Sequence, residues 1–276
     1  MSTAVFEVAM SITTRLDELK ALVKHATKCR DEFNNEKIYN SICRACCVLI
    51  ASNLEGFLKE LSRSLILDLN YYLKDFSKMP TLMQRAFCEK ITYFEGIPDK
   101  DHQQRIKQLI EFFTKNSVSI DLQAITYKQN TNKNPSPSFI DGAFEKLGIY
   151  SILNSIAGTR LEEIFKNNKY SNYSLLKDMS HYRSYLYNFP YKIPPAKYTF
   201  NHIEKPTKHA LPDNTIWHNY IDEILTRRHS IAHGDTLNND TSTKQLESDI
   251  TKLEILMHGL MYSAASQLTS QVEAAT

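Results

Sequence analysis

The sequence is poor in glycine and contains no glycine-rich loop. Its 276 residues include seven glycines, about a third of the number that average usage predicts. No two of them form a Gly-x-Gly pair, and the interval from Gly142 to Gly148 is not followed by Lys and Ser or Thr. The sequence therefore excludes a dinucleotide-binding fingerprint and a nucleotide-binding phosphate loop. A turn-rich β-sandwich is not expected either.

Proline is missing from both ends of the chain. All nine prolines lie between Pro80 and Pro212, so the first 79 residues and the last 64 contain none. Proline inside a helix removes a hydrogen-bond donor and clashes with the preceding turn. Long proline-free flanks with few glycines are therefore typical of long, uninterrupted helices.

A disulfide framework, a membrane-spanning run and a strong net charge are also missing. Five cysteines is an odd number, and three crowd at Cys43, Cys46 and Cys47, which we interpret as small side chains packed in a helix face. No run approaches the ~18 to 20 apolar residues that cross a bilayer, and no signal peptide is visible. We expect a cytoplasmic protein with reduced thiols and no membrane partner. The net charge of +2 means that any basic surface is local.

Apolar residues recur at helical spacing through most of the chain. The predicted helices cover 6–28, 37–76, 81–94, 101–115, 139–147 and 150–166. A further helix capped by Asp213 or Asn214 runs to His233 and is closed by Gly234. Its predicted buried side consists of Ile216, Tyr220, Ile224, Leu225 and Ile231. Ser242 and Gln245 fit a capping box that opens the final helix.

The predicted fold is all-α, a helical bundle with long terminal helices. We expect one domain over 1–276, with loop-like insertions at 117–138 and 181–212. The second insertion contains five tyrosines, five Lys or Arg, five prolines and one acid.

The segment Thr226-Arg-Arg-His-Ser-Ile-Ala-His-Gly-Asp235 places two guanidinium groups and two imidazoles at the end of one predicted helix. This set can cleave RNA without a metal. A histidine with the ordinary pKa of ~6.5 can take a proton from the ribose 2′-hydroxyl or give one to the leaving 5′-oxygen. An arginine can hold the phosphate and stabilise the charge of the transition state.

Arg228, four residues and then His233 match the R-x4-6-H motif of the HEPN superfamily of metal-independent ribonucleases, which this segment resembles. The family favours a polar residue after the motif arginine, and His229 occupies that place. Arg227 also satisfies the spacing, but His229 favours Arg228. The stretch 49–60 resembles the early helix of large stand-alone members with defence functions, in which an acid, here Glu55, faces the site.

The resemblance implies a metal-independent endoribonuclease with no cofactor, in which Arg228, His229, His233 and Glu55 are catalytic. Attack by the 2′-hydroxyl would leave a 2′,3′-cyclic phosphate and a 5′-hydroxyl. The family implies a homodimer in which two motif helices face each other. It also implies a role in antiviral defence or a toxin–antitoxin system, with an antitoxin or another defence-system partner.

The RNA substrate requires a binding surface, for which the sequence offers aromatic and basic residues. Aromatic rings stack on unpaired bases, and cations contact phosphates. We predict Arg227, Arg183, Tyr187 and Lys192 as RNA-binding residues. The alternative for the segment 181–212 is a proline-braced surface loop whose rings pack locally.

Three other interpretations of the motif segment stay open. Basic residues in a last turn can simply oppose the helix dipole, with His233 as a cap. His229 and His233 are spaced as in zinc-binding helices and could be joined by Asp235 and Asp240, although the glutamate of H-E-x-x-H is missing and the arginines would repel a cation. A HEPN-like bundle can also be a non-catalytic interaction or dimerisation module, although such members usually lose the arginine or the histidine.

Overall fold

The protein is all-α. The computed structural model describes residues 2–73, 75–118, 135–145, 147–192, 198, 200–201, 214–234 and 241–275. Over these ranges the regular structure consists of α-helices and short 3-10 helices, with no strand. The predicted fold class is confirmed.

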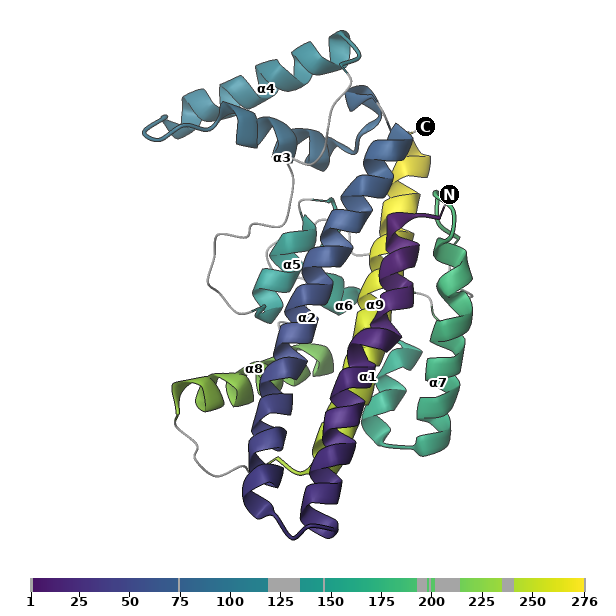
Figure 1. Cartoon of the computed structure of the whole chain (residues 1–276). Helices are drawn as coiled ribbons and strands as arrows, with labels where there is room; N and C mark the ends of the chain where they lie inside the picture. Colours follow the sequence, from purple (N-terminus) through teal and green to yellow (C-terminus); the bar gives the residue numbers. More distant parts are fainter. Residues whose placement is uncertain are drawn as a thin grey trace.

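Three long helices form the body of the molecule (Figure 1). They are α1 (Ala4–Asp31), α2 (Glu36–Leu73) and α9 (Thr243–Ala275). Each of them packs against the other two. These helices occupy the proline-free flanks, as predicted. The apolar residues that recur at helical spacing along α9 are all buried: Leu246, Ile250, Leu253, Leu256, Leu260 and Ala264.

Helix α2 is the central helix of the bundle. By length and composition it could cross a membrane, a test that buried core helices also pass. Its apolar side packs against α1, α8 and α9. Cys43, Cys46 and Cys47 are buried on it as free thiols, and burial raises the pKa of Cys46 to about 12. The interpretation of these cysteines as packing residues is confirmed.

A helical hairpin stands away from the bundle (Figure 1). It follows the short 3-10 helix η1 (Phe76–Lys78) and consists of α3 (Thr81–Thr92) and α4 (Asp99–Lys115). Phe76, Phe87 and Phe113 form an aromatic cluster at its base, with ring centroids 5.3 to 6.2 Å apart. The Phe76 amide donates to the Val118 carbonyl at 3.1 Å, so the chain leaves and returns at one point.

Shorter helices cover the remaining faces of the bundle. They are α5 (Pro137–Glu145), α6 (Ile152–Ser155), η3 (Arg160–Lys166), α7 (Lys169–Tyr182) and η4 (Arg183–Leu186). The single helix predicted over 150–166 is wrong. Gly158, with a φ of 67°, lies in the turn that separates α6 from η3, and an L-residue rarely adopts that conformation.

The two predicted insertions are partly helical. Residues 137–138 belong to α5, and 181–186 belong to the end of α7 and to η4, so the loop assignment is wrong at these positions. Residues 119–134, 193–197, 199 and 202–213 lie outside the described residues.

Candidate active site

The motif segment lies at the end of α8 (Ile216–His233), which runs across α2 and also packs against α5. Tyr220, Ile224 and Leu225 are buried, as the helical spacing predicts, and Trp217 is buried with them. The prediction that Ile216 is buried is wrong, because this first residue of the helix turns its side chain to solvent. The buried side fixes the rotation of α8 and therefore the direction of the side chains that follow.

Both ends of α8 are capped. Thr215 and His218 form a reciprocal capping box, in which the His218 amide donates to Thr215 Oγ1 and the Thr215 amide donates to His218 Nδ1, each at 3.3 Å. The prediction of Asp213 or Asn214 as the cap is wrong by one or two residues. Gly234 closes the helix with a φ of 75°, as predicted. The last turn therefore keeps its helical form out to the tip.

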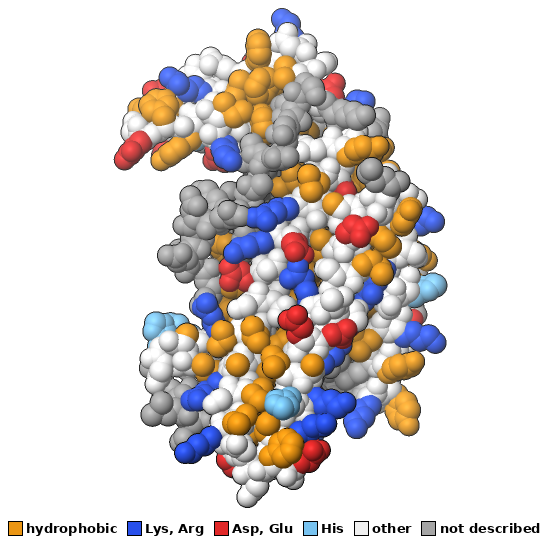
Figure 2. All heavy atoms as spheres, in the orientation of Figure 1, with side chains coloured by type: hydrophobic (Ala, Val, Ile, Leu, Met, Phe, Trp, Pro, Cys, Tyr) orange, Lys and Arg blue, Asp and Glu red, His pale blue; other side chains and the backbone are white. Residues whose placement is uncertain are grey.

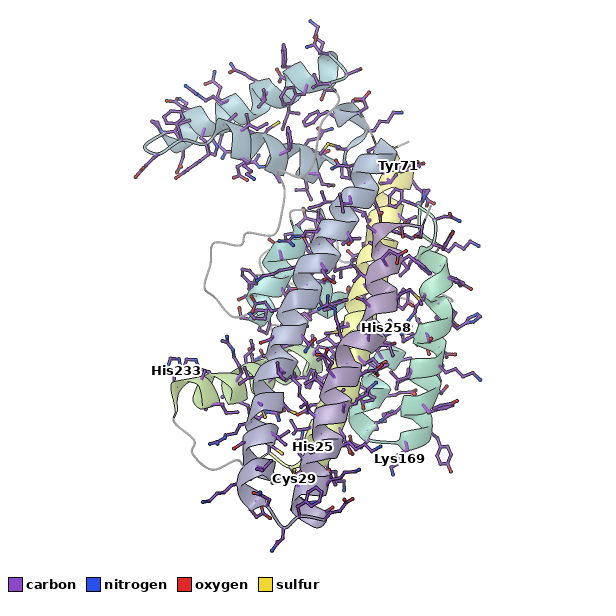
Figure 3. The ribbon with its side chains drawn as sticks, in the orientation of Figure 1. His25, Cys29, Tyr71, Lys169, His233 and His258 are labelled. Atoms are coloured by element: carbon purple, nitrogen blue, oxygen red, sulfur yellow. The ribbon has the colours of Figure 1, made fainter. Side chains whose placement is uncertain are left out.

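His229 and His233 lie side by side on this tip. Both are exposed, and their ring centroids are 4.1 Å apart with an angle of 52° between the planes. Residues four apart share one face of a helix, and here that face is turned away from the buried side. Figure 3 shows His233 at the outer end of α8. Two imidazoles are thus presented together to any molecule that docks there.

Arg227 anchors the same turn to α9. Its Nη2 donates to Asp249 Oδ2 at 2.6 Å and lies 3.7 Å from Glu223 Oε1. The Asp249 side chain is 1% exposed and the Arg227 side chain 21%. Burial alone would lower the pKa of Arg227, but the Asp249 carboxylate more than offsets this and raises it. Arg227 is therefore a fixed cation of the α8–α9 interface, and its predicted contact with RNA stays a prediction.

Asp249 was missed by the sequence analysis, although the sequence contains a signal for it. It lies three residues after Leu246 and four before Leu253, on the inward spacing of α9. Its second oxygen accepts from Gln245 Nε2 at 2.9 Å, and its main-chain carbonyl accepts from the Tyr220 hydroxyl at 2.6 Å. A carboxylate at an inward position requires such partners, because an unpaired buried charge is costly.

Arg228 is half-buried and lies about 100° around the helix from Arg227. The two arginines therefore occupy different environments on α8. Glu55, the predicted acid on α2, accepts a hydrogen bond from Lys59 Nζ at 2.6 Å, one turn further along its own helix. Its predicted catalytic role stays a prediction.

The other predicted RNA contacts lie elsewhere on the bundle. Arg183 Nη2 donates to Thr13 Oγ1 at 2.7 Å and lies 3.4 Å from Nε2 of the buried His258, which Figure 3 shows well apart from His233. Tyr187 packs edge-on against Phe6 near the start of α1, with ring centroids 5.2 Å apart.

Lys192, the last of these predicted contacts, is exposed. Its amide donates to the Tyr185 carbonyl at 3.0 Å, which ties it to η4. The structure thus does not bring Arg183, Tyr187 and Lys192 to the tip of α8.

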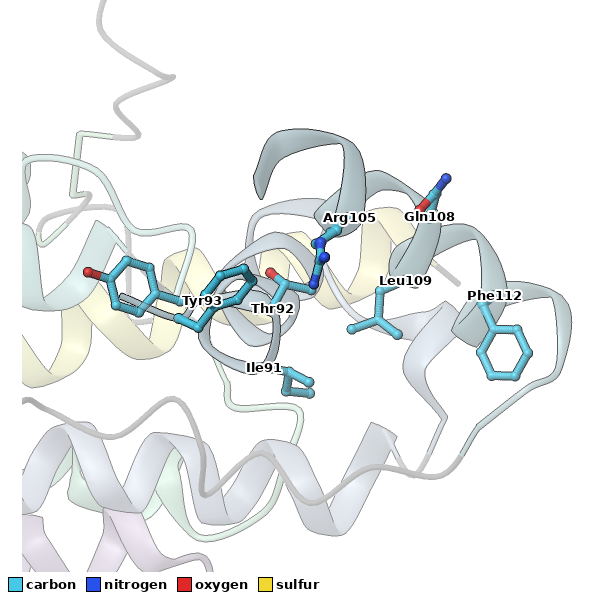
Figure 4. Close-up of a pocket in the computed structure, with 8 residues that line it drawn as sticks. Ile91, Thr92, Tyr93, Arg105, Gln108, Leu109 and Phe112 are labelled. Atoms are coloured by element: carbon cyan, nitrogen blue, oxygen red, sulfur yellow. The ribbon is translucent and has the colours of Figure 1, made fainter. Parts of the chain in front are cut away.

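Two further features bear on the choice of site. The described residues contain no group of three His, Cys, Asp or Glu that could hold a metal ion, while Asp235 and Asp240 lie outside them. A pocket on the α3–α4 hairpin is lined by Ile91, Tyr93, Arg105 and Phe112, among others, and by no histidine or acid (Figure 4). That pocket therefore offers no acid–base pair, and the tip of α8 is the stronger candidate.

An all-helical bundle with Arg-x4-His in the last turns of a late helix defines a HEPN-type domain. The sequence profile of the RiboL-PSP-HEPN family matches residues 11–262, and the chain belongs to this family. A search of curated proteins and a search of solved structures each found no match. HEPN domains are commonly ribonucleases.

Proposed function

We propose that this protein is a metal-independent endoribonuclease that cleaves RNA by attack of a ribose 2′-hydroxyl on the adjacent phosphate. The observation that carries the proposal is the pair of exposed imidazoles, His229 and His233, whose rings are 4.1 Å apart on the tip of α8. Arg228 directly precedes His229 in the chain. The chain also belongs to a family whose domains are commonly ribonucleases, which supports the proposed ribonuclease activity.

The two imidazoles and Arg228 have different roles in the proposed cleavage reaction. One imidazole takes the proton of the 2′-hydroxyl as the 2′-oxygen forms its bond to phosphorus, and an imidazolium gives a proton to the 5′-oxygen as that bond breaks. The products are a 2′,3′-cyclic phosphate and a 5′-hydroxyl. Arg228 stabilises the negative charge that collects on the phosphate oxygens.

The proposed active form is a homodimer, for a geometric reason. In an in-line displacement the base and the acid stand on opposite sides of the phosphorus atom. His229 and His233 of one chain share one helix face, so together they approach a phosphate from one side. Two motif helices facing each other across a two-fold axis supply both sides.

The direct test is cleavage of a 5′-labelled RNA by purified protein in EDTA. We expect cleavage to persist, with products that carry a 2′,3′-cyclic phosphate, and we expect a substrate with a 2′-deoxyribose at the cleaved position to resist. Loss of activity in EDTA would indicate a metal-dependent hydrolase. A pure, folded protein with no activity would indicate the non-catalytic interaction module.

Mixing active and inactive chains tests the composite site. Light scattering is expected to give twice the chain mass of 31.9 kDa. At a threefold excess of His233→Ala chains, wild-type homodimers fall to about one sixteenth of all dimers, against about one quarter expected from dilution alone. If the site needs both copies of His233, the activity per total chain is expected to fall to about one sixteenth of the wild-type value. Activity in proportion to the wild-type chains would mean that each chain cleaves alone or that one copy of His233 suffices. An active monomer would contradict the facing-helix arrangement.

Comparing the two arginines tests which one belongs to the motif. Arg228→Ala is expected to lower the cleavage rate about a hundredfold, because it removes a charge that stabilises the transition state. Arg227→Ala is expected to act mainly by lowering the melting temperature, because it removes the cation that pairs with the buried Asp249 carboxylate. Rates are measured at a temperature where both variants are folded. Equal or reversed losses of rate would assign the motif to Arg227.

We also propose a biological setting. A nuclease of this kind in the cytoplasm endangers its own cell, so a neutralising antitoxin or another defence-system partner is expected. Expression of the wild-type chain alone is expected to arrest growth, whereas the His233→Ala chain is tolerated. Equal growth with both chains would argue against a toxin or defence role.

A further inference from the structure

The outer face of α7 exposes aromatic and basic side chains in a single stripe. Its members are Lys169, Tyr170, Tyr173, Lys177 and His181, all exposed. The Tyr170 side chain is 90% exposed and Tyr173 is 70% exposed. From Lys169 to His181 the stripe spans about 18 Å along the helix axis. We call this set the α7 stripe.

The charge on the α7 stripe is of one sign. The only acid in α7 is Asp178, and its carboxylate accepts from the Tyr198 hydroxyl at 2.7 Å and lies 3.5 Å from Arg160 Nη1. The Asp178 carboxylate therefore points toward Tyr198 and Arg160 and not toward the α7 stripe. Figure 2 shows basic and hydrophobic side chains together along the edge of the molecule where α7 lies in Figure 1.

The packing of α7 does not require the two tyrosines. Leu175, Met179 and Tyr182 are the buried residues of α7 and pack it against the bundle. Tyr170 and Tyr173 lie one turn apart on the opposite side, so their rings are available to a ligand that presents flat, apolar faces. An aromatic ring next to lysines matches the alternation of base and phosphate in a nucleic acid strand.

We propose that the α7 stripe binds single-stranded RNA, with Tyr170 and Tyr173 stacked on bases and Lys169 and Lys177 on phosphates. The inference rests on the proposed function for the identity of the ligand as RNA. Duplex RNA does not fit as well, because its bases are already paired and stacked.

The α7 stripe would act as an exosite. Figure 3 shows Lys169 and His233 on opposite sides of the bundle, so the stripe contacts a part of the strand remote from the cleaved bond. It therefore selects long, unpaired RNA over short fragments. Tyr187, a predicted RNA contact, directly follows η4 and is not one of the residues of the α7 stripe.

The test measures binding without cleavage. The probe is a fluorescein-labelled 2′-O-methyl oligouridine of about twelve nucleotides, which has no free 2′-hydroxyl to attack, and binding to the full chain is followed by anisotropy. Base stacking contributes about tenfold in affinity per ring. The Tyr170→Ala/Tyr173→Ala variant is therefore expected to bind about a hundredfold more weakly than the wild type. Tyr93→Ala, which removes an exposed tyrosine of the α3–α4 hairpin, is the matched control and is expected to bind as wild type.

The lysines are tested through salt dependence. Two phosphate contacts on a single strand contribute about 1.4 to the slope of log affinity against log salt concentration. The Lys169→Ala/Lys177→Ala variant is expected to lose about that much slope, whereas the tyrosine variant keeps it. Lys100→Ala/Lys107→Ala, on the exposed side of α4, is the matched control with an unchanged slope.

The outcomes separate this inference from the proposed function. Binding by wild type that falls in the tyrosine variant supports the exosite, even if the protein cleaves no RNA. If the protein cleaves RNA but the tyrosine variant binds the probe within twofold of wild type, the exosite is wrong and the nuclease stands. The exosite is also wrong if the wild-type protein does not bind the probe, a result that would point to a protein partner for the α7 stripe. It is wrong too if Tyr93→Ala weakens binding as much as the tyrosine double variant does.

Discussion

Replacing His233 by alanine is expected to reduce RNA cleavage by about a hundredfold or more, because in the proposed mechanism this imidazole takes the proton of the 2′-hydroxyl or gives one to the leaving 5′-oxygen. The melting temperature is expected to stay at the wild-type value. His233 is exposed on the tip of α8, and the Gly234 cap that ends the helix is formed by backbone groups alone. The measurement is the initial rate of cleavage of a labelled RNA, together with thermal unfolding of the same preparation.

His25→Ala is the matched control for this loss. His25 is an exposed histidine on α1, and Figure 3 shows it on another part of the molecule. Its removal is expected to leave cleavage unchanged. Near wild-type cleavage by His233→Ala would remove His233 from the mechanism, and unfolding of that variant would show that the residue supports the fold.

Asp249→Ala is expected to lower the free energy of unfolding by about 3–5 kcal/mol, which is the typical cost of removing one partner of a buried ion pair. The Arg227 guanidinium would lose the carboxylate that contacts it at 2.6 Å, and Gln245 would lose an acceptor. The end of α8 would then be attached to α9 less firmly. Chemical denaturation followed by circular dichroism measures the change.

Glu223→Ala separates the buried pair from the exposed one. The Glu223 side chain is 58% exposed and its oxygen lies 3.7 Å from Arg227 Nη2, so its removal is expected to cost less than about 1 kcal/mol. A similar loss for both variants would mean that α8 is not held by the Arg227–Asp249 pair.

Much of the fold follows from local patterns in the sequence. The proline-free flanks and the spacing of apolar residues predict α1, α2 and α9 because these helices bury a continuous stripe. Helix α7 was not predicted, since its sequence is rich in Asn, Ser and Tyr. The signals for it are the Asn168 cap, which accepts from the Tyr170 and Ser171 amides, and the buried spacing of Leu175, Met179 and Tyr182.

The sequence predicts the part of the site that lies within one helix, but not the contacts between helices. His229 and His233 share a face because they are four residues apart, which any helix enforces. The role of Arg227 depends on Asp249, which is 22 residues away on another helix, and no local pattern pairs the two. The same limit applies to Arg183, whose position beside Thr13 depends on how η4 packs on α1.

The α3–α4 hairpin has a consequence for how this chain can change during evolution. The segment begins and ends at one point, where the Phe76 amide meets the Val118 carbonyl at 3.1 Å. An excursion with adjacent ends is a module that can be lengthened, exchanged or replaced by a short turn while the chain on either side keeps its course. The hairpin can therefore change in length or sequence without a change in the path of α2 before it.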